Sequence, residues 1–171
     1  SGAAYMYIAA VTCVSPTDCM AVGGTNNSTA AESWNGSTWT VVPTANPSTN
    51  SSILGGVSCV SATDCTAVGS SGGQPILEQW DGSSWTVVST PVSDGYGILE
   101  DVSCTSATFC QAVGETTTNA GIGASVPVIL SWDGTEWTSV SSPLTLAPGD
   151  SGGLFHVSCY EASDCLAIGW A

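Results

Sequence analysis

Short runs of alternating apolar and polar residues recur along the chain, and each run leads into a turn rich in serine, threonine, aspartate or glycine. Alternation with a period of two is typical of a half-buried β-strand, and two such runs around a turn predict a β-hairpin. β-branched residues dominate these runs, and no segment has the period of a helix. The pattern therefore predicts an all-β protein.

The first recurring hairpin carries two cysteines. Its four copies are VTCVSPTDCMAVGG at 11–24, VSCVSATDCTAVGS at 57–70, VSCTSATFCQAVGE at 102–115 and VSCYEASDCLAIGW at 157–170. In each copy, Val-x-Cys leads into the turn and Cys-x-Ala-Val/Ile-Gly leads away from it. The first cysteines follow one another at intervals of 46, 45 and 55 residues. Self-similarity at such a period predicts a repeat architecture.

The second recurring hairpin carries two tryptophans. Its three copies are ESWNGSTWTVVPT at 32–44, EQWDGSSWTVVST at 78–90 and LSWDGTEWTSVSS at 130–142. Asn-Gly and Asp-Gly supply residues that accept the positive φ of tight hairpin turns. The tryptophans flank the turn in pairs that we expect to meet across each hairpin: Trp34 with Trp39, Trp80 with Trp85, and Trp132 with Trp137.

Two hairpins in each repeat make one four-stranded unit, which is the blade size of a β-propeller. On its C-x5-C hairpins and W-[DN]-G-[ST]-x-W turns, the chain resembles secreted bacterial β-propeller-like repeat proteins, broadly those with kelch-like or Asp-box-like blades, over residues 8–171. The resemblance implies a fold and no activity. We expect a single repeat domain at 1–171, a β-propeller-like array of four-stranded antiparallel blades. Three complete blades are expected at about 9–54, 55–99 and 100–153, and a half blade at 154–171.

The two kinds of hairpin differ in number, with four cysteine hairpins against three tryptophan hairpins. Residues 1–8 are too few to supply the missing pair of strands. Either the chain is part of a longer protein or a neighbouring subunit covers the open edge, because an uncovered strand edge is a template for pairing. A head-to-tail contact that does not close would generate a filament.

The eight cysteines form four pairs with five residues between the members: Cys13 and Cys19, Cys59 and Cys65, Cys104 and Cys110, and Cys159 and Cys165. An even count at a repeated spacing predicts one disulfide in each hairpin and an oxidising compartment. Zinc binding is the alternative, although its sites usually have shorter C-x2-4-C spacing. We expect a secreted, extracellular or cell-surface protein. The chain shows no signal peptide and does not begin with Met, so it is interpreted as a mature or excised piece.

The charge is one-sided, with fourteen Asp or Glu, no Lys or Arg and a net charge of −14. Nucleic-acid binding and adhesion to anionic lipids are excluded, because both depend on Lys and Arg. No apolar run is long enough for a transmembrane helix, so no membrane insertion is expected. The partners expected are further copies of the chain, or another protein or glycan at the cell surface.

Two features attract a catalytic interpretation. Gly149–Gly153 reproduces the GDSGG around the nucleophile of chymotrypsin-like proteases, and His156 follows closely. That mechanism needs a histidine base and an aspartate placed around the serine, and in that family the base lies far upstream. We therefore expect a loop, a surface histidine, no catalytic residue and no enzyme.

The paired tryptophans have two interpretations, since their rings could stack on sugars or form the core between blades. The repeated Asn35, Asp81 and Asp133 suit tight turns for backbone reasons. Each turn offers at most one clear carboxylate, too few for calcium, so no metal and no cofactor are expected. Asn-x-Ser/Thr sequons occur at Asn26, Asn27, Asn35 and Asn50.

These observations favour a non-catalytic extracellular structural or adhesive protein, which assembles head-to-tail into a filament or surface layer through its incomplete terminal blade. The alternative is a carbohydrate-binding, lectin-like propeller module that uses the tryptophan turns. Burial of the tryptophans would weaken the alternative, and an open groove lined by them would strengthen it.

Overall fold

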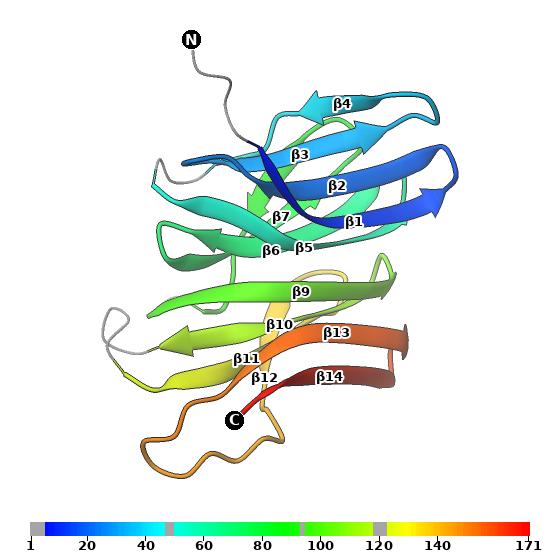
Figure 1. Cartoon of the computed structure of the whole chain (residues 1–171). Coiled ribbons are helices and arrows are strands. Elements are labelled where there is room, and N and C mark those ends of the chain that lie inside the picture. Colours follow the sequence, from blue (N-terminus) through cyan, green and yellow to red (C-terminus); the bar gives the residue numbers. More distant parts are fainter. Residues whose placement is uncertain (1–5, 47–49, 93–94, 118–122) are drawn as a thin grey trace.

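The computed structural model of the chain describes residues 6–46, 50–92, 95–117 and 123–171, and the regular structure in these ranges is β-strand (Figure 1). The first sheet contains β1 (Tyr7–Ser15), β2 (Asp18–Gly24), β3 (Thr29–Trp34) and β4 (Trp39–Val42). The second contains β5 (Ser52–Ser61), β6 (Asp64–Ser71), β7 (Gln74–Trp80) and β8 (Trp85–Val88). The third contains β9 (Tyr96–Ser106), β10 (Phe109–Thr117), β11 (Ser125–Trp132) and β12 (Trp137–Val140). The last contains β13 (Gly153–Glu161) and β14 (Asp164–Trp170).

Neighbouring strands in each sheet follow one another in the sequence and pair antiparallel. Three sheets are therefore complete four-stranded blades and the last is a half blade, as predicted. Each first strand begins before the boundary expected for its unit, at Tyr7, Ser52, Tyr96 and Gly153. The reason is that the residues preceding Val-x-Cys continue the strand through a bulge, which alternation alone does not reveal.

Each cysteine hairpin is closed by one disulfide, which confirms the predicted pairing. Cys59 and Cys65 lie directly opposite each other in the ladder, and the Cα atoms of each bonded pair are 4.0 Å apart. Each bond closes a short loop and contributes about 2 kcal/mol in the chain-entropy model. Four disulfides indicate folding in an oxidising environment.

Each tryptophan hairpin is held by the Asx side chain in its turn. In the second sheet, Asp81 Oδ1 accepts hydrogen bonds from the amides of Ser83 and Ser84, both at 2.8 Å. Gly82 has a φ of 93°, a conformation that glycine adopts without strain. Asn35 and Asp133 accept the equivalent pairs of bonds in the other two turns.

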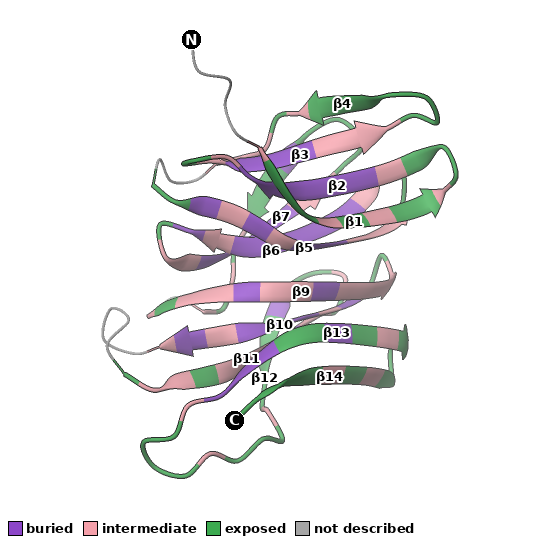
Figure 2. Ribbon diagram, viewed as in Figure 1, coloured by how far each residue is buried: buried purple, intermediate pink, exposed green. Residues whose placement is uncertain are grey.

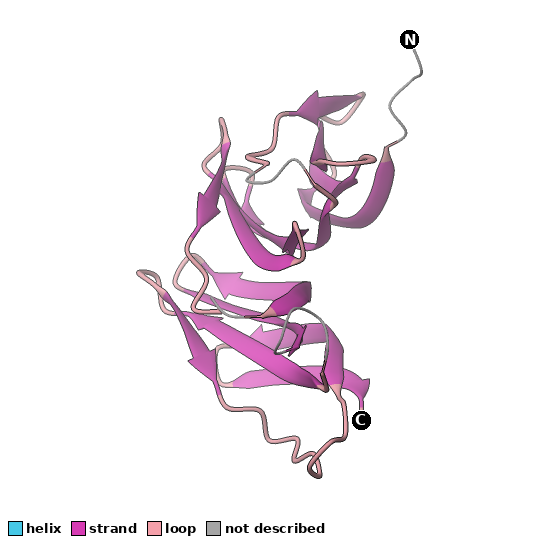
Figure 3. Cartoon of the chain, turned by 90° about the vertical axis from the view of Figure 1, so that its left-hand side faces the viewer, coloured by secondary structure: helices cyan, strands magenta, loops and turns pink. Residues whose placement is uncertain are grey.

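The sheets stack in chain order, with the first strands β1, β5, β9 and β13 side by side and with β1 and β14 in the two sheets at opposite ends of the array (Figure 1). Seen from the side, the array follows a curve (Figure 3). Side chains link the first strands, because Ser58 Oγ accepts the amide of Cys104 and Ser103 Oγ accepts the amide of Cys159, each at 3.0 Å.

The hydrophobic core consists of three clusters, one between each pair of adjacent sheets. Between the first two sheets, Met20 and Val22 pack with Leu54, Val57 and Trp85. The positions of Val22, Leu54 and Val57 recur in the next cluster as Val68, Leu99 and Val102, and Trp137 takes the place of Trp85. Figure 2 shows the consequence, because buried residues concentrate in the middle of the array and exposed residues on β1 and β14. The second and third sheets therefore depend on both neighbours for their burial.

Candidate functional site

The half blade presents an apolar face that has no neighbour in the described part of the chain. Leu166 is 73% exposed and Ile168 is also exposed. The residues at these positions of the first sheet, Met20 and Val22, are buried against the second sheet. β14 therefore carries the residues of an inter-blade contact without the blade that would cover them.

The opposite end of the array is open in the same way. Ile8 and Val11 on β1 are exposed, whereas Leu54 and Val57, at the equivalent positions of β5, are buried. We call the surface formed by Leu166 and Ile168 the C-terminal end face. We call the surface formed by Ile8 and Val11 the N-terminal end face. They are the two complementary halves of the contact that is repeated inside the array.

A groove of about 690 Å³ lies between the third sheet and the half blade. Its walls include Val113 on β10, Ile129 on β11, Val140 on β12 and Leu154 on β13. No Asp, Glu or His lines it, although the chain has fourteen acidic residues. The groove is therefore suited to an apolar occupant.

The six predicted tryptophans form three ring pairs with centroids 5.5, 5.7 and 5.8 Å apart. The first member of each pair donates its Nε1–H to a carbonyl in the cysteine turn: Trp34 to Pro16, Trp80 to Ala62 and Trp132 to Ala107. Each such bond joins the two hairpins of one blade. The role of the rings in ligand binding remains a prediction.

The second members differ in burial although their local sequences match. Trp85 and Trp137 are 4% and 5% exposed, whereas Trp39 is 44% exposed. The difference arises because Trp85 and Trp137 pack against the preceding sheet, and no sheet precedes Trp39 in the described residues. Two of the six rings are thus enclosed between blades.

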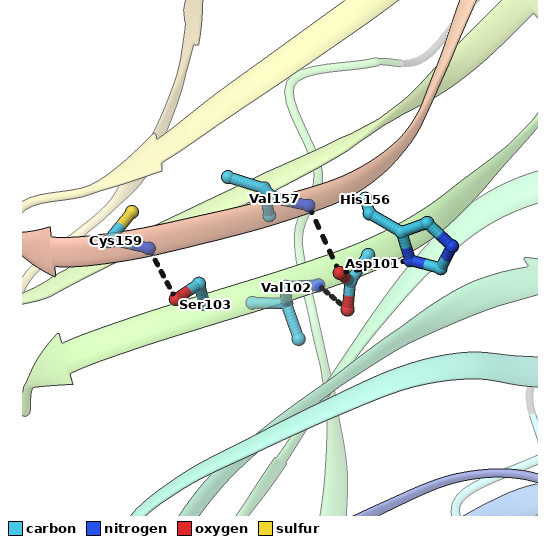
Figure 4. A network of polar contacts seen from close by, with 6 residues as sticks. All are labelled: Asp101, Val102, Ser103, His156, Val157 and Cys159. Carbon is cyan, nitrogen blue, oxygen red and sulfur yellow. Dashed lines mark hydrogen bonds and ion pairs between the residues drawn. The ribbon is translucent and has the colours of Figure 1, made fainter. Parts of the chain in front are cut away.

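The protease-like loop and the histidine have separate structural contacts. Ser151 Oγ accepts the amide of Ser125 at 3.1 Å, which fastens the loop to β11. His156 is exposed, and its Nδ1 lies 3.5 Å from Asp101 Oδ2 (Figure 4). That carboxylate also accepts the amides of Val102 and Val157, so Asp101 joins β9 to β13. Both residues therefore have structural contacts: Ser151 holds its loop against β11, and Asp101 joins β9 to β13.

The first strands carry a smaller groove of about 380 Å³, lined by residues from β1, β5, β9 and β13. Glu100 lies in it beside His156 and Phe155. Burial raises the pKa of Glu100, the nearby Glu115 raises it further, and His156 lowers it. This groove combines aromatic and acidic groups on the surface shared by all four units.

The turn aspartates have lowered pKa values because the turn itself stabilises their charge. The hydroxyl of Ser83 and the amides of Ser84 and Ser83 lower the pKa of Asp81 to about 2. The hydroxyl of Thr135 is the largest of the equivalent causes at Asp133. Among the described residues, no three His, Cys, Asp or Glu side chains are grouped to hold a metal ion. The same residues include no helix of the length and apolarity needed to cross a membrane.

Glu78 is a buried carboxyl group that the sequence analysis missed. It lies on β7 with no exposed surface, its Oε2 accepts the amide of Ala45 at 3.2 Å, and its Oε1 accepts the hydroxyl of Thr29 at 3.4 Å. Burial raises its pKa above the ordinary value, and the two hydrogen bonds only partly oppose this effect. Because Leu130 occupies the equivalent place in LSW, comparison of the repeats offers the one available signal of burial.

Glu78→Gln is expected to reduce the pH dependence of stability. A pKa raised in the folded state means that folding takes up a proton, so stability falls as pH rises from the ordinary glutamate range through the folded pKa. The variant should be more stable than the wild type at neutral pH and should differ little from it in acid. Urea unfolding over a pH series measures this difference. Equal slopes in the wild type and in Glu78→Gln would contradict the expectation.

Comparisons with known proteins identify the fold and nothing narrower. No protein-family model matches the chain, and no curated protein matches its sequence. A solved structure described as "YCF48 bound to D1 peptide" superposes with a TM-score of 0.60 at 15% identity. The match covers 98% of this chain and 51% of that one, so the chain spans about half the length of the structure it matches. That structure is a β-propeller, which confirms the predicted fold class, and the kelch or Asp-box resemblance stays a prediction.

Proposed function

We propose that the chain is a non-catalytic, extracellular structural module that assembles head-to-tail through its two end faces and so contributes to a filament, surface layer or adhesive surface. One observation carries the proposal: each end exposes apolar residues whose equivalents are buried between blades elsewhere in the chain. The C-terminal end face corresponds to the surface that receives a following blade. The N-terminal end face corresponds to the surface that such a blade presents.

The energetic argument follows from these residues. Full burial of a Leu, Ile or Val side chain is worth about 1.5–3 kcal/mol. Contact between Leu166 and Ile168 of one copy and Ile8 and Val11 of the next would therefore favour association. The net charge of −14 opposes it by repulsion between copies, which dissolved salt screens. Association should accordingly strengthen as salt concentration rises.

Carbohydrate binding by the tryptophan hairpins receives less support. Trp85 and Trp137 are buried and offer no face to a sugar ring, and the first tryptophan of each pair is engaged with the cysteine turn. Protein binding is also in keeping with the matched propeller, whose description names a bound peptide. Binding of a protein partner, which here is a further copy of the chain, is therefore the function we favour.

Ile168→Asp tests the proposal by placing a carboxylate on the C-terminal end face. Wild-type protein is expected to increase in mass with concentration by light scattering, and more strongly at high salt, whereas the variant should remain a single chain. Val87→Asp, an exposed valine on the fourth strand of the second sheet, is the matched control and should associate like the wild type. A wild type that stays monomeric at every concentration and salt level would overturn the proposal.

A further inference from the structure

β14 has a free edge beside the 690 Å³ groove. In each complete sheet, the second strand pairs with the first strand on one side and with a third strand on the other. In the described residues, β14 pairs only with β13. Backbone donors and acceptors along β14 are thus available next to an apolar groove, which is the arrangement that strand addition uses.

The last residue of each fourth strand shows what the groove lacks. Val42 is half-buried and packs against the cluster that contains Trp85 of the next sheet. Val88 is half-buried and packs against the cluster that contains Trp137. Val140 is at the same position of the third sheet, yet it is exposed and lines the groove. The groove therefore lies where a further tryptophan hairpin would pack.

Two other residues that line the groove also correspond to residues that pack around a tryptophan inside the array. Val113 and Ile129 are at the positions of Val22 and Ala31, which pack in the cluster around Trp85. The absence of charged lining residues disfavours an acidic or basic ligand, because neither would find a partner there.

We propose that the β14 edge and this groove bind a β-hairpin of a partner protein with the chemistry W-[DN]-G-[ST]-x-W. Its first strand pairs antiparallel with β14 and places its first tryptophan opposite Cys165, as Trp80 lies opposite Cys65 in the second sheet. Its second tryptophan enters the groove beside Val140. This inference goes beyond the proposed function, because it concerns the strand edge and the groove, and it does not require the end faces to meet.

Binding of the hairpin would also extend the C-terminal end face. Inside the array, Trp85 packs over residues of the third and fourth strands of the preceding blade, among them Ala31 and Val42. The half blade has no such strands in the described residues. A bound hairpin would supply these strands. The exposed Trp39 of a following copy in a head-to-tail assembly could then pack against them.

A synthetic peptide with the sequence of residues 126–142, VPVILSWDGTEWTSVSS, is the probe, because Leu130 occupies the position at which the other two tryptophan hairpins carry a glutamate. The protein is the Val11→Asp variant, in which the head-to-tail contact is blocked, so failure of self-association does not affect the result. Saturable binding of one peptide per chain is expected, with slower hydrogen exchange at the amides of Asp164–Trp170. A control peptide with serine in place of both tryptophans should not bind. Equal binding of the two peptides, or binding without protection of β14, would overturn the proposal.

A substitution in the groove locates the site. Val140→Asp in the same background should weaken peptide binding by at least about tenfold, because the hairpin would bury an unpaired carboxylate. Val87→Asp places the same group on an exposed fourth-strand valine outside the groove, and it should bind as tightly as its parent. Equal affinities for the two variants would contradict the assignment of the groove.

An isolated hairpin of this length is marginally stable in water, so a tethered form provides the second measurement. The peptide sequence is attached after Ala171 through a flexible glycine-serine linker, which raises its effective concentration to roughly the millimolar range. The fusion should melt at a higher temperature than the parent and protect β14, and the fusion with serine at both tryptophans should do neither. Matching melting temperatures and exchange rates in the two fusions would refute the proposal.

Discussion

Replacement of Trp85 by alanine is expected to lower the free energy of unfolding by about 3–5 kcal/mol. The ring is 4% exposed and packs with Met20, Val22 and Leu54 between the first two sheets. Its loss would remove a large apolar contact and leave a cavity that the rigid ladders on both sides cannot close. Denaturant unfolding followed by circular dichroism measures the change.

Trp39→Ala is the matched control, because Trp39 has the same place in the same kind of turn. It is 44% exposed, and the centroid of its ring lies 5.5 Å from that of Trp34. Its replacement should cost less than about 1.5 kcal/mol. Similar losses for the two variants would mean that the tryptophans act within their own hairpins and not between blades.

Gly69→Ala is expected to be comparably damaging, with a loss on the order of 3 kcal/mol or failure to fold. Gly69 lies opposite Leu54 where the β5–β6 ladder is irregular. A β-carbon there would overlap the carbonyl oxygen of Ile53 and lie 2.8 Å from the α-carbon of Leu54. Because both atoms belong to the backbone of β5, no side-chain movement could relieve the overlap.

Ser70→Ala, at the next residue, changes a half-buried side chain without adding an atom and should be tolerated within about 0.5 kcal/mol. The same overlap recurs at Gly23, Gly114 and Gly169. Thermal melting of Gly69→Ala and Ser70→Ala measures the difference in stability between the two variants. A Gly69→Ala protein as stable as the wild type would contradict this close approach of the β5 backbone to Gly69.

The hairpins, their turns and the disulfides were predictable because each is determined within a few residues of sequence. Asp81 holds its own turn, and Cys59 meets Cys65 across a five-residue gap. The glycine of Cys-x-Ala-Val-Gly was visible as a repeated residue, but its cause was not. That cause is a close approach to the backbone of β5, which depends on the register of the ladder.

Burial could not be predicted, because it depends on which blade lies on either side. Trp39 and Trp85 share the sequence S-x-W-T-V-V and differ in exposure. Glu32 and Glu78 are likewise at the same position of E-x-W, yet only Glu78 is fully buried between sheets. The incomplete last unit followed from counting hairpins, whereas the groove beside it required the arrangement of the third sheet in space.

Mixing two blocked variants tests the head-to-tail account most directly. Val11→Asp blocks the N-terminal end face and Ile168→Asp blocks the C-terminal one, so each alone should remain a 17.1 kDa chain by sedimentation equilibrium. In the mixture, the open C-terminal face of the first variant can meet the open N-terminal face of the second, and the predicted product is a dimer of twice that mass that grows no further. A mixture that stays monomeric while the wild type associates would contradict the account, as would either variant associating by itself.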